Sequence, residues 1–99
     1  MILVAGTIRI AADKQDALRP AAATMIEKTR AEAGCIVYSF GWDMVEPGLI
    51  RIYEEWQSRA HLDAHIATDH MADWRAALGE IGVLERNVKI FEAEQVGSV

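Results

Sequence analysis

The sequence predicts a single α+β domain over residues 1–99, built on a four-stranded antiparallel sheet with helices on one face. Two observations predict it. Four segments rich in β-branched and aromatic residues are separated by segments in which apolar residues recur every three or four positions. No repeat, linker or low-complexity stretch divides the chain, and 99 residues support one modest core.

The first strand is expected over residues 2–10, which are mostly apolar and β-branched. Asp13 can cap the helix that follows. Pro20 must break that helix or lie in its first turns, so the regular part is expected to begin near Arg19 and to stop before Gly34. One stripe of this helix carries Leu18, Ala21, Ala22, Met25, Ile26 and Thr29.

A hairpin is expected next, with strands over residues 36–42 and 49–56. Residues 45–48, Val-Glu-Pro-Gly, have the chemistry of a turn between them. Ser58 can then cap a short helix that reaches about Ile66. One face of the second strand carries Ile36, Tyr38, Phe40 and Trp42.

Thr68 or Asp69 can open the last helix, which Gly79 and Gly82 are expected to end. Its helical spacing is carried by Met71, Trp74, Leu78 and Ile81. The last strand is expected from residue 86 to about 94. The element order β-α-β-β-α-α-β is a ferredoxin-like layout with a divided second helix.

Apolar residues lie on both faces of the expected sheet, although helices can cover only one face. Four strands of six residues present a face of roughly 400 Å², and an apolar patch of that size indicates a partner. We therefore expect a homodimer that packs sheet to sheet. The first face carries Ile2, Val4, Ile8, Phe40, Trp42, Ile50, Ile52, Trp56, Val88 and Ile90. The opposite face carries Leu3, Ala5, Val37, Leu49, Tyr53, Phe91 and Ala93.

Composition and charge exclude several classes of partner. The net charge is −5, and ten basic residues are scattered among fifteen acidic ones, which argues against a nucleic-acid partner. No apolar run approaches the 18 or so residues that a membrane span needs, and Arg9 already interrupts the first apolar segment. Cys35 is the only cysteine, so no intramolecular disulfide forms and the cytoplasm is the expected compartment.

Three short segments resemble the antibiotic biosynthesis monooxygenase domain family, part of the dimeric α+β barrel superfamily. They match the family's acidic-x-Gly-Cys-x-x-Tyr start of strand two, its Tyr-Glu-x-aromatic strand end, and its Ala-His and Thr-x-His-aromatic/Met helix motifs. The segments are Glu32-Ala33-Gly34-Cys35-Ile36-Val37-Tyr38, then Tyr53-Glu54-Glu55-Trp56, and then Leu62, Ala64-His65 and Thr68-Asp69-His70-Met71 with Trp74.

The resemblance implies a pocket between the sheet and the helices of each subunit. It also implies oxidation of a small aromatic quinol or phenol by molecular oxygen without metal or flavin. A deprotonated quinol reduces oxygen directly, so the protein needs only aromatic walls, a base, a hydrogen-bond partner and exclusion of water. The same fold carries other activities, so an isomerase and a non-enzymatic ligand-binding or stress-response module stay open as alternatives.

His65 and Glu54 are the expected catalytic residues. His65 follows Leu62 by three positions on the short helix and so points partly toward the sheet, and imidazole suits a base or a hydrogen-bond partner for a phenol. The alternative for His65 is a hydrogen-bonded core residue. Glu54 shares an apolar strand face and needs a partner, for which His65 and Arg75 are candidates, and it is expected to orient His65; a structural ion pair is the alternative.

An aromatic slot for the substrate is expected to involve Tyr38, Phe40, Trp56, His70 and Trp74, each of which could instead simply pack in the core or lie at the surface. A metal could be held by His61, His65 and Asp69, which are spaced by four residues, but these lack the adjacent Glu of a zincin, and no metal is expected.

Haem is not expected either. Haem-degrading relatives carry an Asn in the first strand, a Trp at the position of His65 and a ligating His about ten residues later. This chain has Gly6 and Thr7 in the first strand and Arg75 ten residues after His65.

Overall fold

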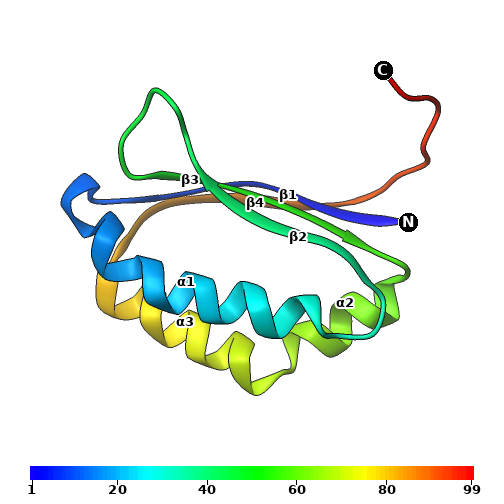
Figure 1. The fold of residues 1–99 in the computed structure, drawn as a ribbon, viewed down its shortest axis with the longest axis horizontal. Helices are drawn as coiled ribbons and strands as arrows, with labels where there is room; N and C mark the ends of the chain where they lie inside the picture. Colours follow the sequence, from blue (N-terminus) through cyan, green and yellow to red (C-terminus); the bar gives the residue numbers. More distant parts are fainter.

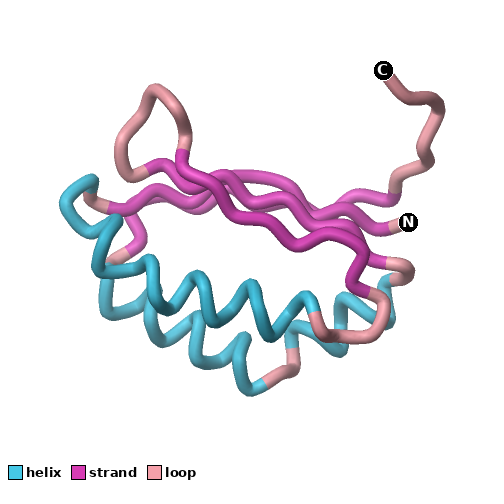
Figure 2. Tube along the Cα trace, viewed as in Figure 1, coloured by secondary structure: helices cyan, strands magenta, loops and turns pink.

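All the helices lie on one face of a four-stranded antiparallel sheet (Figures 1 and 2). The structure is a computed structural model that describes residues 1–99. The strands are arranged in the order β2-β3-β1-β4, which confirms the predicted fold class. The elements are β1 (Ile2–Ile10), a 3₁₀ turn η1 (Ala12–Lys14), α1 (Gln15–Arg30), β2 (Cys35–Trp42), β3 (Leu49–Trp56), α2 (Arg59–Ile66), α3 (Asp69–Ile81) and β4 (Val83–Glu92).

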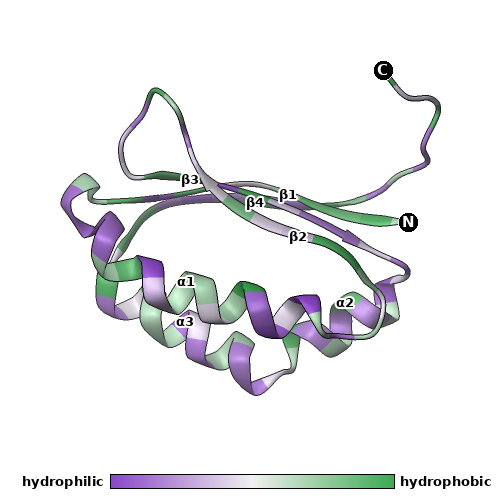
Figure 3. Ribbon diagram, viewed as in Figure 1, coloured by the Kyte–Doolittle hydropathy of each residue, from purple (hydrophilic) through white to green (hydrophobic).

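The core lies between the sheet and the helices, where alternate residues of each strand face α1 and α3. In β1 the buried Val4 and Ile8 lie opposite Glu54 and Ile50 of β3. Trp56, at the end of β3, is completely buried. Figure 3 shows hydrophobic residues along β1 near the N-terminus and interspersed with polar ones on the helices. The core face expected from the sequence therefore holds most of the core, although Leu49, expected on the opposite face, is also buried and Ile90, expected on the core face, is exposed.

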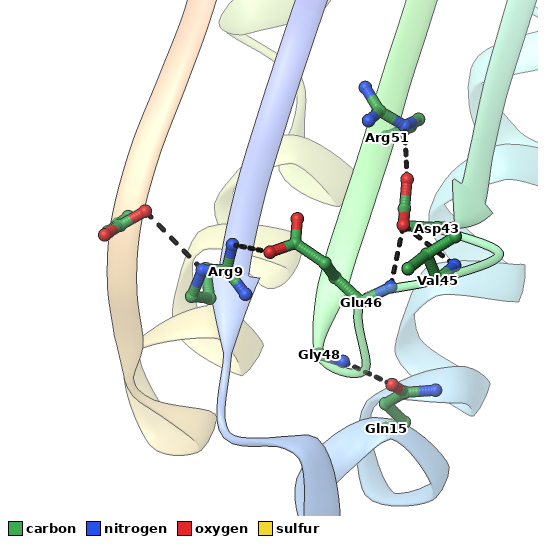
Figure 4. Close-up of polar contacts among 8 residues, drawn as sticks. Arg9, Gln15, Asp43, Val45, Glu46, Gly48 and Arg51 are labelled. Carbon is green, nitrogen blue, oxygen red and sulfur yellow. Dashed lines mark hydrogen bonds and ion pairs between the residues drawn. The ribbon is translucent and has the colours of Figure 1, made fainter.

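Helix α1 begins at Gln15, so the expected start near Arg19 is wrong. Pro20 lies inside the helix, where it is exposed, so water can reach the backbone carbonyl that loses its partner. Asp13 falls in η1 and caps neither helix. Instead the Gln15 side-chain carbonyl accepts a hydrogen bond from the Gly48 N–H, which joins the start of α1 to the β2–β3 loop (Figure 4).

The β2–β3 loop is organised around Asp43. Its carboxylate accepts hydrogen bonds from the backbone N–H groups of Val45 and Glu46 and from Arg51 Nε (Figure 4). These three bonds, the backbone ones above all, hold the pKa of Asp43 at about 2. The turn predicted from Pro47 and Gly48 thus closes on a carboxylate that sequence patterns did not single out.

The direction of Ile36 and the end of α3 also differ from the sequence prediction. A register shift between Cys35 and Val37 turns Ile36 outward, where it is 50% exposed, so Ile36 does not share the core face with Tyr38. Gly79 lies within α3, and Gly82 alone, with φ 89°, ends that helix.

Strand β4 begins at Val83 rather than at residue 86 and ends at Glu92, because Val83 already pairs with Ile10.

The face of the sheet away from the helices is open in the single chain. Phe91 is 46% exposed there, and Tyr53 is also exposed. No helix combines the length and apolar character that crossing a membrane requires.

Candidate active site

A cavity of about 330 Å³ lies between the sheet and helices α2 and α3. Four polar side chains reach it, those of Glu54, His65, Arg75 and Arg86. Its other lining residues are apolar or aromatic: Val4, Ile8, Tyr38, Phe40, Ile52, Leu62, Ile66, Met71, Trp74, Leu78, Val88 and Ile90. An apolar cavity with a few convergent titratable groups is the arrangement typical of a small-molecule site.

A second cavity of about 220 Å³ lies beside α1, on residues that include Phe40 and Trp74. Arg19 is its only ionisable residue, and Arg19 already pairs with Asp16. This second cavity therefore offers no acid–base pair, and we take the cavity that contains Glu54 and His65 as the candidate site.

His65 is held in one orientation by the groups around it. It is 2% exposed, and its Nδ1 lies 2.8 Å from Glu32 Oε2. Its ring packs against Trp56 and Tyr38, with ring centroids 4.8 and 5.3 Å away. Because an ionised carboxylate only accepts, the bond to Glu32 places the ring hydrogen on Nδ1 and leaves Nε2 as the free acceptor.

Helix caps position His65 and the start of α3. Ser58 caps α2, as predicted, by accepting a hydrogen bond from the His61 N–H. Thr68 caps α3, accepts from the Met71 N–H and donates its hydroxyl hydrogen to the His65 carbonyl. The junction between the two helices is thus fixed beside His65.

Glu32 links two histidines and was missed as a site residue. Its Oε2 lies 2.8 Å from His65 Nδ1 and 2.8 Å from His70 Nε2. Glu32 lies in the turn before the Gly34-Cys35 motif, and nothing in the strand or helix periodicity indicates the direction of a side chain in that turn. His70, expected at the edge of the substrate slot, lies behind His65 on Glu32 and does not line the cavity.

The side chains that could hold a metal are not the set His61, His65 and Asp69 that the sequence spacing suggests. Ligand atoms of Glu32, His65 and His70 lie within 4.8 Å of one another. His61 instead hydrogen bonds through Nδ1 to the Ser58 hydroxyl, and Asp69 is not part of this group.

Glu54 hydrogen bonds to Trp56, so the expected partners His65 and Arg75 are wrong. Its Oε1 accepts from Trp56 Nε1 at 2.9 Å, and no ion pair involves Glu54. Burial raises the pKa of Glu54 to about 7; the Trp56 hydrogen bond opposes this rise and the charge of Glu32 adds to it. Trp56 donates this hydrogen bond to Glu54 but does not line the cavity, although it was expected to form a wall of the substrate slot.

The two titratable groups of the cavity each keep one free atom. Neither the second oxygen of Glu54 nor His65 Nε2 has a hydrogen-bond partner in the protein. Thr29 Oγ1 is the only fully buried side-chain polar atom that lacks a partner. The two unpartnered atoms of Glu54 and His65 are therefore not fully enclosed. Burial lowers the pKa of His65, and its bond to Glu32 opposes that effect. Near neutral pH both groups can therefore accept a proton from a bound weak acid.

Aromatic walls surround these two groups. Tyr38, Phe40 and Trp74 line the cavity, as expected, and Phe40 packs on Trp74 with ring centroids 5.2 Å apart. Burial raises the pKa of Tyr38, so its hydroxyl stays protonated. The cavity thus places aromatic side chains beside two proton acceptors.

The raised pKa of Glu54 predicts a pH-dependent stability. Between pH 4.5, the ordinary pKa of a glutamate, and about pH 7, the folded chain holds a proton on Glu54 that the unfolded chain has released. The contribution of Glu54 to the free energy of unfolding is therefore full below pH 4.5 and is lost as the pH rises through 7. Glutamine cannot ionise, so the Glu54→Gln variant avoids this loss. On going from about pH 4.5 to pH 8, its free energy of unfolding should rise by about 3 kcal/mol relative to that of the parent. Urea unfolding of both proteins at the two pH values measures it, and a difference independent of pH contradicts the burial argument.

Known proteins are similar to this chain in sequence and in fold. The antibiotic biosynthesis monooxygenase family profile matches residues 1–77. An uncharacterized protein, sll1783 of Synechocystis, is 33% identical over 91 residues, which are 92% of this chain and 62% of the relative, so the chain spans less than two thirds of that protein. The putative monooxygenase Rv0793 of Mycobacterium tuberculosis is 36% identical over 69 residues (70% and 67% of the two chains). The probable quinol monooxygenase YgiN of Escherichia coli is 31% identical over 78 residues (71% and 74%).

Solved structures agree with these relatives. A putative antibiotic biosynthesis monooxygenase from Deinococcus radiodurans superposes with a TM-score of 0.91 at 25% identity, over 100% of this chain and 98% of that one. The structure of Rv0793 superposes with a TM-score of 0.84 at 28% identity, over 98% of each chain. Since the profile covers most of the chain and the fold extends over all of it, this protein belongs to the antibiotic biosynthesis monooxygenase family.

Proposed function

We propose that the protein oxidises a small aromatic quinol or phenol with molecular oxygen and uses no resident metal or flavin. The observation that carries the proposal is the apolar, aromatic cavity in which His65 Nε2 and one oxygen of Glu54 are free. The monooxygenase-like relatives support it, and one of them is named as a probable quinol monooxygenase.

In this proposal His65 removes the proton from a ring hydroxyl. Glu32, rather than Glu54, orients the imidazole and stabilises it once it is protonated. Glu54, whose pKa burial raises to about 7, hydrogen bonds the second hydroxyl of a quinol. The apolar walls keep bulk water from the anion, and Trp74 and Phe40 stack on its ring.

The overall reaction balances without another reductant. The quinol anion gives electrons to oxygen, one oxygen atom bonds to a ring carbon, and the other leaves as water. The product is a hydroxyquinone, so the quinol supplies all four electrons. The protein's part is to hold the ring, to accept the proton on His65 and to return it to the departing oxygen.

Oxygen uptake tests the proposal. Metal-stripped protein is mixed with a panel of benzoquinols and naphthoquinols in an oxygen electrode, and uptake above buffer should rise in proportion to protein concentration. Isotope-labelled oxygen should appear in the product and in water in equal amounts. Quinol conversion without oxygen consumption would favour an isomerase, and binding without conversion a ligand-binding module.

The proposal includes a second copy of the chain over the open face of the sheet. Phe91 and Tyr53 leave that face partly apolar, and a sheet-to-sheet homodimer would bury it. We place the protein in the cytoplasm, which its one free cysteine fits.

Sedimentation tests the dimer. The parent should sediment at about twice its chain mass at micromolar concentration, and Phe91→Asp should sediment as a monomer because it buries a charge in the interface. Met44→Asp, in the exposed β2–β3 loop, is the matched control and should stay dimeric. A parent that is monomeric under these conditions rules the dimer out.

A further inference from the structure

Two arginines reach the cavity from opposite walls. Arg75 comes from α3, and Arg86 comes from β4. Arg86 is paired across the sheet with Ile8, which is buried and also lines the cavity, so Arg86 lies on the helix-facing side of β4. Arg75 Nη1 reaches the Ile66 carbonyl at 3.5 Å, a long bond at the end of α2. Its charge is close enough to His65 to contribute, after burial, to the lowered pKa of that ring.

Neither of these guanidinium groups has a carboxylate partner. Acidic residues outnumber basic ones by fifteen to ten, and most other arginines are paired with them. Glu85, the neighbour of Arg86, pairs with Arg9. The paired arginines are Arg9, Arg19, Arg51 and Arg59. Two unpaired guanidiniums at one cavity in an acidic chain are available to a ligand, and their planar donors match a carboxylate.

We infer that the substrate is an aromatic quinol or phenol that also carries a carboxylate. Arg75 and Arg86 bind the carboxylate at the mouth of the cavity, while the ring hydroxyl reaches His65 and Glu54 further in. This inference rests on the proposed function and names its substrate class. A cavity of about 330 Å³ is small for a ligand site, which fits a molecule of one or two rings.

The test compares 2,5-dihydroxyphenylacetate with its methyl ester. The methylene group separates the charge from the ring, so the two quinols are oxidised with similar ease and differ mainly in the anion. For the parent, kcat/KM of oxygen uptake should be about tenfold higher with the acid than with the ester. In Arg75→Gln, Arg86→Gln and the double variant this ratio should fall toward one. Arg59→Gln, which removes an exposed arginine that pairs with Asp63 on α2, should keep the parent's ratio.

A second readout separates this inference from the proposed function. Binding of 1-naphthylacetate, which is not a quinol, is followed by quenching of tryptophan fluorescence. If neither quinol consumes oxygen but naphthylacetate binds the parent and binds the double variant about tenfold more weakly, the monooxygenase proposal fails and the anion site stands. An acid-to-ester ratio near one in the parent, an unchanged ratio in the double variant, or no uptake together with no binding overturns the inference.

Discussion

The His65→Ala variant is expected to lose about 100-fold or more in kcat/KM for quinol-dependent oxygen uptake, with its fold intact. A positioned base contributes on the order of 10² to 10⁴ to such a rate, and His65 is the histidine that lines the cavity and keeps a ring nitrogen without a partner in the protein. An oxygen electrode measures the loss with saturating and limiting quinol. The control is His61→Ala, one turn earlier on the same helix, where the ring contacts Ser58 and does not line the cavity.

The pH profile identifies the base. Because burial lowers the pKa of His65, activity that depends on its neutral form should fall only as the pH drops below about 6.5. If the fall instead centres near pH 7 and disappears in Glu54→Gln, Glu54 is the base. A His65→Ala variant within a few-fold of the parent would remove His65 from the mechanism.

The Gly6→Ala variant is expected to lose about 3 kcal/mol or more in free energy of unfolding, or to fail to fold. Gly6 lies in β1, at the centre of the sheet between β3 and β4. A methyl group there would overlap the Asn87 carbonyl and lie 2.6 Å from Val88 Cα. Both obstacles are backbone, so relief requires β4 to move away from β1 and the ladder between them to break.

Urea unfolding measures this loss, and a second glycine supplies the control. Gly79 lies in α3 with open space around its Cα, so Gly79→Ala should gain about 0.5–1 kcal/mol from helix propensity. The two variants add the same methyl group with opposite expected signs. A Gly6→Ala protein as stable as the parent would mean that β1 and β4 are not as close as the structure places them.

Elements with local signals were predictable from the sequence. Helices α2 and α3 begin where Ser58 and Thr68 cap them, because a capping side chain acts on its own neighbouring backbone. The start of α1 was not predictable from Pro20, because the cost of an internal proline depends on whether the freed carbonyl reaches water. The register shift near Ile36 has no sequence signal of this kind, since pairing with β3 decides it.

The candidate site was also predictable from the sequence only in part. Periodicity placed His65 and Glu54 toward one cavity, because each lies on a regular element with a defined face. The hydrogen bond between Glu54 and Trp56 could have been predicted, since residues two apart on a strand share a face and a buried indole N–H needs an acceptor. The hydrogen bond between Glu32 and His65 could not have been predicted, because it joins a turn to a helix 33 positions away.

Strand β4 supplies part of the cavity wall through Arg86, Val88 and Ile90, yet it pairs with only one strand, β1. A wall held along a single edge can detach and return while β1, β2 and β3 stay together, at a free energy below that of global unfolding. Movement of this edge strand would widen the cavity without separating the helices. Such a fluctuation of β4 would add to the exchange of ligand through the mouth of the cavity.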